Sequence, residues 1–202
     1  MLLLFCMILL ATMPTQWDFE QSPVGQLPAG WSAAKTGEGM GSIWKVLAGD
    51  TSQVLAQTSS AGPNGLFNLC VADSSSYRDL ELSVAIKAVA GKNDRGGGPV
   101  WRYRDDGNYY VARWNPLEDN FRVYKVVAGK RIQLGTADVK APADRWHTIK
   151  ITQVGDEIRC YLDGTLHLQA KDDTFQTAGK IGLWTKSDAV AHFDDLMATE
   201  LK

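Results

Sequence analysis

The chain has 202 residues, of which 45% are hydrophobic, so it can bury a substantial core within one domain. Its 21 basic and 23 acidic residues leave a formal net charge of −2, and no overall positive field attracts nucleic acid. Any binding of an anion must therefore be local, and nucleic acid is not an expected partner.

The first residues, Met1 to Met13, form an apolar run shorter than the roughly 20 residues of a membrane-spanning helix. We therefore expect residues 1–15 to be a signal peptide and residues 16–202 to be a single mature domain without a membrane span, secreted or periplasmic. No Lys or Arg precedes the run and its cleavage pattern is weak, so a retained N-terminal anchor is the alternative. Lipidation of Cys6 is not expected, because the bulky Phe5 precedes it.

Strand patterns follow one another along the chain, and helical periodicity never appears. A loop rich in Gly and Pro is expected from Ser22 to Gly41. The segment Asp79–Val89 alternates apolar and polar residues, which predicts a long half-buried strand. Shorter strands are expected at Ile43–Leu47, Gln53–Gln57, Leu66–Val71, Arg131–Gly135, Trp146–Val154, Glu157–Leu162, Leu166–Ala170, Lys180–Thr185 and Ala191–Thr199. Roughly a dozen short strands separated by turn signals predict an all-β sandwich or jelly roll.

The segment Gly96–Val127 is divided by two turns, Asp105–Asn108 and Asn115–Asn120, and is predicted to be a three-stranded antiparallel meander. Period-two alternation gives it a face suited to the core, formed by Trp101, Tyr103, Tyr110, Ala112, Trp114, Phe121 and Val123. The opposite face collects Arg102, Arg104, Tyr109, Arg113, Asn115, Asn120, Arg122 and Tyr124. Four arginines on one face repel one another unless something anionic or polar lies there.

Two cysteines, Cys70 and Cys160, remain if the leader is removed, and export would permit a disulfide between them. The alternative is that both are small hydrophobic residues on strands. They and the three histidines, His147, His167 and His192, lack the spacing of metal ligands, so no zinc or iron site is expected.

Four motifs carry a resemblance to a known fold: WHTIKI (146–151), IRCYLDG (158–164), GKIGLW (179–184) and HFDDL (192–196). They resemble concanavalin A-like and laminin-G-like jelly rolls. More narrowly, nearly the whole mature chain is similar to bacterial secreted domains of unknown function grouped with 3-keto-disaccharide hydrolases and family 16 glycosidase-like proteins. The resemblance implies an all-β, two-sheet antiparallel jelly-roll sandwich of the concanavalin A-like lectin/glucanase type, a fold that hosts lectins, glycosidases, lyases and adhesion modules.

In the resembled fold such a meander belongs to the concave sheet, where glycans lie. Guanidinium and amide groups grip sugar hydroxyls or carboxylates, and aromatic rings stack on the sugar ring. The predicted saccharide contacts are therefore Arg102, Tyr109, Arg113, Asn115, Asn120, Arg122, Trp184 and Lys186. The arginines favour an acidic or oxidised sugar, unless carboxylates such as Glu118, Asp119, Asp105 and Asp106 neutralise them. The alternative for this face is an ordinary solvated convex surface.

The two ends of the mature chain carry a pattern that holds a structural calcium in several resembling jelly rolls. An acidic residue follows an early Phe at Phe19-Glu20, and another follows the Phe of the closing strand at Phe193-Asp194. The resemblance thus implies a calcium site at Glu20 and Asp194, since calcium prefers oxygen ligands. The alternative is that an aspartate bonds backbone amides at a turn.

Catalysis is the weaker prediction, because the acidic E-x-D-x-x-E run of family 16 enzymes is absent. Glu118 is the only candidate acid or base, and its alternative is a pair with Arg113 or Arg122. The sequence therefore predicts a jelly roll that binds a polysaccharide or oligosaccharide and requires no cofactor beyond the calcium. A glycoside hydrolase of the 3-keto-disaccharide hydrolase type and an adhesion domain without a ligand are the two alternatives.

Overall fold

The computed structural model describes residues 13–202, and within that range every regular element is a β-strand. Most of the predicted signal peptide, including Cys6, lies outside the described residues, and its predicted end at residue 15 is the first residue of β1. No helix of this range is long and apolar enough to cross a membrane. The strands are β1 (Thr15–Trp17), β2 (Trp31–Thr36), β3 (Trp44–Ala48), β4 (Gln53–Gln57), β5 (Phe67–Ala72), β6 (Leu80–Ala90), β7 (Gly98–Asp105), β8 (Asn108–Asn115), β9 (Asn120–Val127), β10 (Lys130–Asp138), β11 (Trp146–Val154), β12 (Glu157–Leu162), β13 (Thr165–Lys171), β14 (Lys180–Lys186) and β15 (Val190–Glu200).

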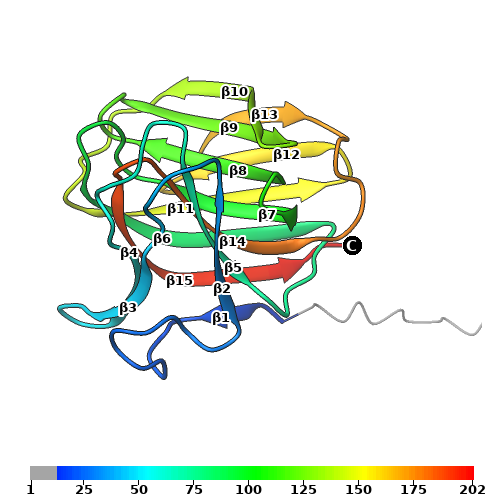
Figure 1. The fold of residues 1–202 in the computed structure, drawn as a ribbon. Helices are drawn as coiled ribbons and strands as arrows, with labels where there is room; N and C mark the ends of the chain where they lie inside the picture. Colours follow the sequence, from blue (N-terminus) through cyan, green and yellow to red (C-terminus); the bar gives the residue numbers. More distant parts are fainter. Residues whose placement is uncertain (1–12) are drawn as a thin grey trace, which may run out of the picture.

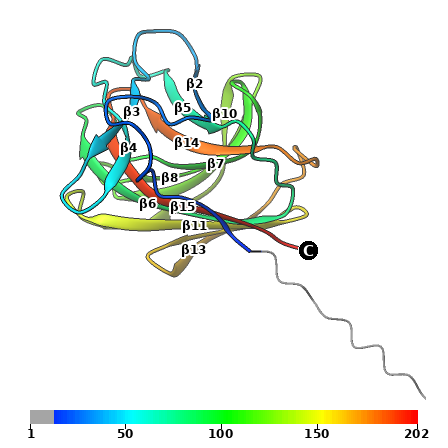
Figure 2. The same ribbon diagram turned by 90° about the horizontal axis from the view of Figure 1, so that it is seen from below.

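The strands form two layers that face each other (Figures 1 and 2). One sheet has eight strands, in the order β13-β12-β11-β6-β15-β4-β3, with β1 paired to β15. The other has seven strands, in the order β10-β9-β8-β7-β14-β5-β2. Neighbouring strands run antiparallel in both sheets, so the predicted all-β antiparallel sandwich is confirmed.

The main core lies between the two sheets and takes alternate residues from each. In β6 the buried residues are every second one, as the predicted half-buried strand requires: Leu80, Leu82, Val84, Ile86 and Ala88. The predicted meander is confirmed as β7–β9, and it contributes Trp101, Tyr110, Ala112, Trp114, Phe121 and Val123 to the same core. Cys70 and Cys160 are also buried there as free thiols, and burial raises the pKa of each.

A second apolar cluster, called here the outer aromatic cluster, lies on the face of the seven-stranded sheet that points away from the core. It consists of Phe67, Leu69, Val71, Val100, Tyr109, Val111, Tyr124, Val126 and Trp184. Arg131 of β10 lies across it, with its guanidinium 4.5 Å from the ring centre of Tyr124, 5.2 Å from Phe67 and 5.9 Å from Trp184. Cation–π attraction and the apolar stem of the arginine explain how one charged residue covers three rings.

The loop predicted from Ser22 to Gly41 is wrong in its second half, because Trp31–Thr36 forms β2 at the edge of the seven-stranded sheet. An edge strand pairs on one side only, and β2 pairs with β5 alone. Its central residues, Ser32 to Lys35, are exposed or half-buried rather than alternating. The period-two signal that reveals a half-buried strand is therefore missing from this segment.

Candidate functional site

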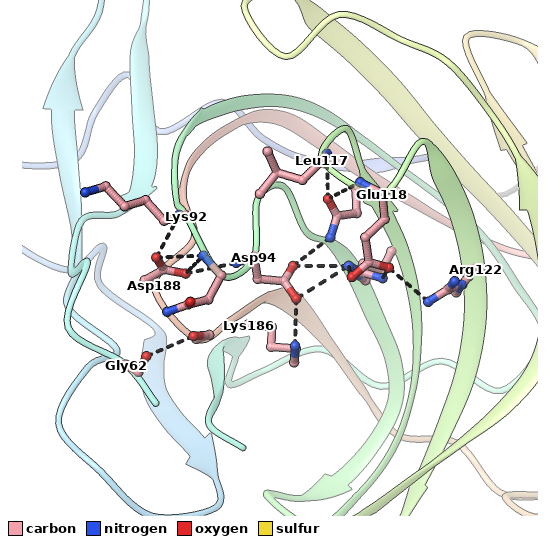
Figure 3. Close-up of polar contacts among 12 residues, drawn as sticks. Gly62, Lys92, Asp94, Leu117, Glu118, Arg122, Lys186 and Asp188 are labelled. Carbon is pink, nitrogen blue, oxygen red and sulfur yellow. Dashed lines mark hydrogen bonds and ion pairs between the residues drawn. The ribbon is translucent and has the colours of Figure 1, made fainter. Parts of the chain in front are cut away.

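The candidate site lies at one end of the outer face of the seven-stranded sheet (Figure 3). There β8 ends, β9 begins, β14 ends and the loop from β6 to β7 crosses them. Strand register places Arg113 opposite Arg122 and Asn115 opposite Asn120. The turn between β8 and β9 is held by the Asn115 side-chain oxygen, which accepts hydrogen bonds from the backbone amides of Leu117 (2.8 Å) and Glu118 (3.3 Å).

Asp94, from the β6–β7 loop, is the centre of the polar network. Its carboxylate accepts hydrogen bonds from Arg113 Nη2 (3.2 Å), Asn115 Nδ2 (3.0 Å) and Lys186 Nζ (2.8 Å). The side chains of Asp94 and Arg113 are each only 1% exposed. A buried carboxylate surrounded by two cations and an amide is fully compensated, which is the condition for charge to be stable in an interior.

Glu118 joins this buried pair to the surface. Its Oε1 lies 3.1 Å from Arg113 Nη2, and its Oε2 lies 3.0 Å from Arg122 Nη1 and accepts a 3.0 Å hydrogen bond from Asn120 Nδ2. Burial alone would raise the pKa of Glu118, but the hydrogen bond from Asn120 and the charges of the two arginines lower it to about 2. Glu118 is therefore ionised at neutral pH and locked as an acceptor between two guanidinium groups.

The loop that carries Asp94 is fixed by backbone contacts. Asp188 accepts hydrogen bonds from the backbone amides of Lys92 (2.7 Å), Asn93 (3.1 Å) and Asp94 (3.0 Å). Burial acts to raise the pKa of Asp188, but these amides lower it below its ordinary value. Gly97 has a φ of 159°, and a Cβ there would lie 2.2 Å from the carbonyl oxygen of Trp184, so the Gly-rich run allows close backbone approach.

Arg102 does not share this face with Arg113, contrary to the prediction. It has a left-handed φ of 45°, and the register of β7 against β8 shifts between Trp101 and Asp105, so strict alternation ends there. The guanidinium turns into the end of the sandwich, where it donates to the carbonyls of Phe175 (2.7 Å) and Gly155 (2.9 Å) and pairs with Asp79.

The same shift moves two neighbours of Arg102. Tyr103, predicted for the core, lies outside it and stacks on Tyr109, with ring centres 6.0 Å apart. Arg104, predicted for the outer face, lies over the ring of Phe175, a core residue, at 5.1 Å. Of the four arginines predicted for this face, only Arg113 and Arg122 lie on it.

Most of the remaining predicted saccharide contacts are present but buried. Tyr109, Asn115 and Trp184 have no exposed surface, and Asn120 is 3% exposed. Trp184 does point away from the core, as predicted, since Ile181 and Leu183 face inward, but Phe67 and Arg131 cover its ring. It therefore offers no open stacking surface. Among the predicted contacts, accessible side chains remain at Arg122, 31% exposed, and Lys186, 16% exposed.

Sequence reasoning missed two residues of the site, Asp94 and Arg131. Asp94 lies in the loop between β6 and β7, where no period-two pattern shows which face of a sheet a side chain will meet. Arg131 has no ion-pair partner within residues 13–202, and its Nη1 is buried without a hydrogen-bond partner. Arg113 Nε is likewise buried without a hydrogen-bond partner. A separate effect acts on Arg122, whose pKa is raised by its interaction with the Tyr124 side chain. The only signal available for Arg131 was the period-two alternation of the strand expected at Arg131–Gly135, which assigns Arg131 to one face of the sheet.

The residues predicted to bind calcium, Glu20 and Asp194, lie close together in space. Burial raises the pKa of Asp194, and the charges of Asp195 and Glu20 raise it further. Glu20 Oε1 accepts a hydrogen bond from the backbone amide of Gln53, whose own side-chain oxygen is buried without a hydrogen-bond partner. Residues 13–202 contain no group of three or more His, Cys, Asp or Glu side chains placed to hold a metal ion. Two carboxylates and one unpaired amide oxygen are nevertheless donors of the kind that calcium takes.

Comparison with known proteins identifies the family to which the chain belongs. Residues 24–198 match the family described as 3-keto-alpha-glucoside-1,2-lyase-like domain. None of the curated proteins matches the chain. The family resemblance carried by the sequence motifs is confirmed.

Several solved structures share the fold. The carbohydrate-binding module CBM66 from Bacillus subtilis has a TM-score of 0.70 at 20% identity, covering 88% of this chain and 100% of its own. Domain 4 of AbnA, a GH43 extracellular arabinanase from Geobacillus stearothermophilus solved with arabinotriose, has a TM-score of 0.59 at 12% identity, covering 94% and 93%. The exoplasmic/lumenal domain of VIP36, solved with Ca²⁺ and mannose, has a TM-score of 0.62 at 13% identity, covering 92% and 89%. At these identities the likeness concerns the fold, and the concanavalin A-like sandwich is confirmed.

Proposed function

The chain belongs to the family of 3-keto-alpha-glucoside-1,2-lyase-like domains, and we propose that it is a saccharide-binding domain whose ligand lies on the outer face of the seven-stranded sheet. The ligand would contact the accessible part of the polar network, Arg122, Glu118 and Lys186, together with Arg131. The solved domains from CBM66 and AbnA support the proposal, since both come from carbohydrate-binding or carbohydrate-degrading proteins.

The observation that carries the proposal is the fixed geometry of the exposed rim. Glu118 stands 3.0 Å from Arg122 and is tied to the buried Arg113, so acceptor and donor are held in place before any ligand arrives. Sugar hydroxyls need such neighbouring donors and acceptors, and pre-organisation reduces the entropy lost on binding. Beside the rim, the rings of the outer aromatic cluster are buried beneath Arg131, so the ligand would meet the Arg131 guanidinium there and not an open ring face.

The charge of the site favours an acidic or oxidised sugar. Arg113, Arg122, Arg131 and Lys186 stand against Asp94 and Glu118, which is four cations against two carboxylates, a net charge of +2. Asp94 and Glu118 neutralise the site only in part, and Arg131 is the cation left without a carboxylate among the described residues. A uronate carboxylate, or the polarised oxygen of a 3-keto group, is a matching partner for that guanidinium.

An enzymatic role has the family match in its favour, but the predicted acid or base is badly suited to it. A pKa of about 2 keeps Glu118 ionised, so it has no proton to donate at neutral pH and is a weak base. Its position between Arg113 and Arg122 instead matches the ion-pair alternative. Binding is therefore the function that the chemistry of this site supports best.

The test is a calorimetric titration with three sugars built on one scaffold: methyl glucoside, its C6 uronate and its 3-keto derivative. We expect the uronate or the keto sugar to bind more tightly than the neutral glucoside, and Arg122→Ala to weaken that binding by about tenfold or more, the loss of one charged hydrogen bond. The matched control is Arg159→Ala, an exposed arginine of the eight-stranded sheet.

Equal weakening by Arg122→Ala and Arg159→Ala, or no binding of any of the three sugars, would overturn the proposal. Turnover of the 3-keto sugar that Glu118→Gln abolishes while affinity persists would instead establish an enzyme. Thermal unfolding of each variant controls for loss of fold.

Calcium is a separate proposal for the region where the two ends of the domain meet. Glu20, Asp194 and the Gln53 side-chain oxygen would hold the ion, which would neutralise the neighbouring carboxylates there. We expect added calcium to raise the melting temperature, a chelator to reverse the rise, and Asp194→Asn to abolish it. Magnesium is the control ion, and an unchanged melting temperature with calcium would refute the site.

A further inference from the structure

A hollow of about 410 Å³ lies on the outer face of the other, eight-stranded sheet, away from the site described above. Strand register places three of its lining residues in one row across the sheet: His192 of β15 is opposite Lys87 of β6, and Lys87 is opposite Trp146 of β11. The remaining residues of its wall are Ala48, Gly49, Asp50, Thr51, Ser52 and Val54, from the β3–β4 hairpin. The hollow is thus bounded by an aromatic residue on one side and a polar turn on the other.

The turn that forms one wall is fixed in position. The backbone amide of Gly49 donates to the carbonyl of Ser52 across the turn (2.9 Å), and Ser52 Oγ donates to Asp194 Oδ2 of the neighbouring strand (2.7 Å). Asp50, at the tip of this tethered turn, lines the hollow. The hollow is therefore a built feature and not a gap beside a loose loop.

The side chains of this hollow are available to a ligand. Trp146 is 43% exposed, whereas all the other tryptophans of the chain are buried or half-buried. Neither the side chain of Lys87 nor that of Asp50 has a hydrogen bond or an ion pair within residues 13–202. The exposed ring of Trp146 belongs to neither apolar cluster, and it lines one hollow together with a side-chain donor and a side-chain acceptor that have no partner in the described residues.

We propose that this hollow is a second saccharide site, which takes one neutral sugar ring stacked on Trp146. The Asp50 carboxylate would accept hydrogen bonds from two adjacent hydroxyls, and Lys87 would donate to a third oxygen. Lys87 and Asp50 cancel in charge, so an anionic sugar gains nothing here, unlike at the positively charged site on the other sheet. The proposal rests on these residues alone and is independent of the function proposed for that site.

Two sites on opposite faces would have a functional consequence. A domain that holds one saccharide on each face can bridge two chains of a polysaccharide, or engage one chain twice with a gain in avidity.

The experiment is a nuclear magnetic resonance titration that follows the tryptophan indole signals, with the Trp146 signal identified by its loss in Trp146→Phe. The probes are the methyl glycosides of glucose, galactose and mannose. We expect at least one to shift the Trp146 signal saturably, and Asp50→Asn and Lys87→Ala each to weaken that binding by about tenfold, the worth of one hydrogen bond to a charged group. Val154→Ala, which alters an exposed residue at the other end of β11, is the matched control and leaves the affinity unchanged.

Three results would overturn the proposal: no saturable shift with any of the three glycosides, an affinity in Asp50→Asn and Lys87→Ala unchanged from that of the unmodified protein, or a shift produced by the C6 uronate of methyl glucoside and by none of the three neutral glycosides. Because the side chains of Lys87 and Asp50 have no hydrogen-bond or ion-pair partners among the described residues, neither variant is expected to unfold the protein, and a melting curve of each checks this.

Discussion

The polar network around Asp94 on the seven-stranded sheet and the hollow beside Trp146 on the eight-stranded sheet contain charges of two different kinds. On the seven-stranded sheet, Arg113, Asp94 and Glu118 are paired with one another, and the first two are buried. On the eight-stranded sheet, Lys87 and Asp50 line a hollow without pairing at all. Charges that are paired and buried stabilise the folded structure, because removing one of them leaves its partner buried without compensation. Unpaired, accessible charges cost the fold little to remove and are free to meet a ligand. The difference separates residues that hold a site in shape from residues that touch what binds there.

The largest effect should come from Arg113→Ala, which removes one partner of a buried ion pair. We expect a loss of about 3–5 kcal/mol in the free energy of unfolding, because Asp94 is left buried with a diminished set of donors. Denaturant unfolding measures the loss, and Lys87→Ala on the opposite face is the control. A loss below about 1 kcal/mol for Arg113→Ala would mean that the pair is not needed for folding.

A smaller loss should follow from Asp188→Ala, which removes the acceptor for the amides that position Asp94. We expect about 1–3 kcal/mol, the cost of leaving buried donors unsatisfied. Hydrogen exchange at the amides of Lys92, Asn93 and Asp94 should speed up in this variant. Unchanged exchange there would show that the loop is held by other contacts, such as the close packing at Gly97.

The two faces should also differ in the pH at which they lose stability. The pKa of Glu118 falls from an ordinary 4.5 to about 2 in the folded protein, so its contribution is present above about pH 4.5 and is lost as the pH falls toward 2. The effect should be small, because the side chain is 40% exposed and solvent screens it.

His192, on the opposite face, titrates in a higher range. Burial and the charge of Lys87 lower its pKa below the ordinary 6.5, so the unfolded chain takes up the proton first and stability declines as the pH falls below about 6.5. The Glu118→Gln variant should lack the decline in stability at the lower pH, and the His192→Gln variant should lack the decline at the higher pH. Denaturant unfolding of both variants across the pH range measures this. Identical pH profiles for the two variants would contradict the assignment.

The smallest effect on stability is expected for Arg122→Ala. Its ion pair with Glu118 is accessible, with side chains 31% and 40% exposed, and such pairs contribute about 0–1 kcal/mol. If this variant loses saccharide binding while Arg113→Ala mainly loses stability, the distinction between contact and scaffold is established. A loss of more than about 2 kcal/mol for Arg122→Ala would remove that distinction.

Period-two alternation determined much of this protein in advance. It predicted the buried side of β6 and the core face of β8 and β9, and every strand expected from Ile43 onward is present with its ends displaced by at most three residues. The reason is physical: in a strand with one face in the core, burial of alternate residues dominates the energy and leaves a readable pattern.

The same reasoning failed wherever that alternation is interrupted or absent. At Arg102 a single left-handed residue shifts the register and sends Arg102 and Arg104 away from the outer face, and no residue type in the sequence marks that shift. At the edge strand β2 no side is fully buried, so there was no pattern to detect.

The sequence by itself determined the sandwich, the family and the polar character of the face that bears Arg113 and Arg122. Only the tertiary structure decided which charges on that face are buried, because their partner Asp94 arrives from a separate loop and Arg131 arrives from the neighbouring strand to cover the aromatic rings. Only the tertiary structure brought Asp50, Lys87 and Trp146 around one hollow. Strand pattern reports which way a side chain points, whereas accessibility and pairing depend on what the rest of the chain places above it.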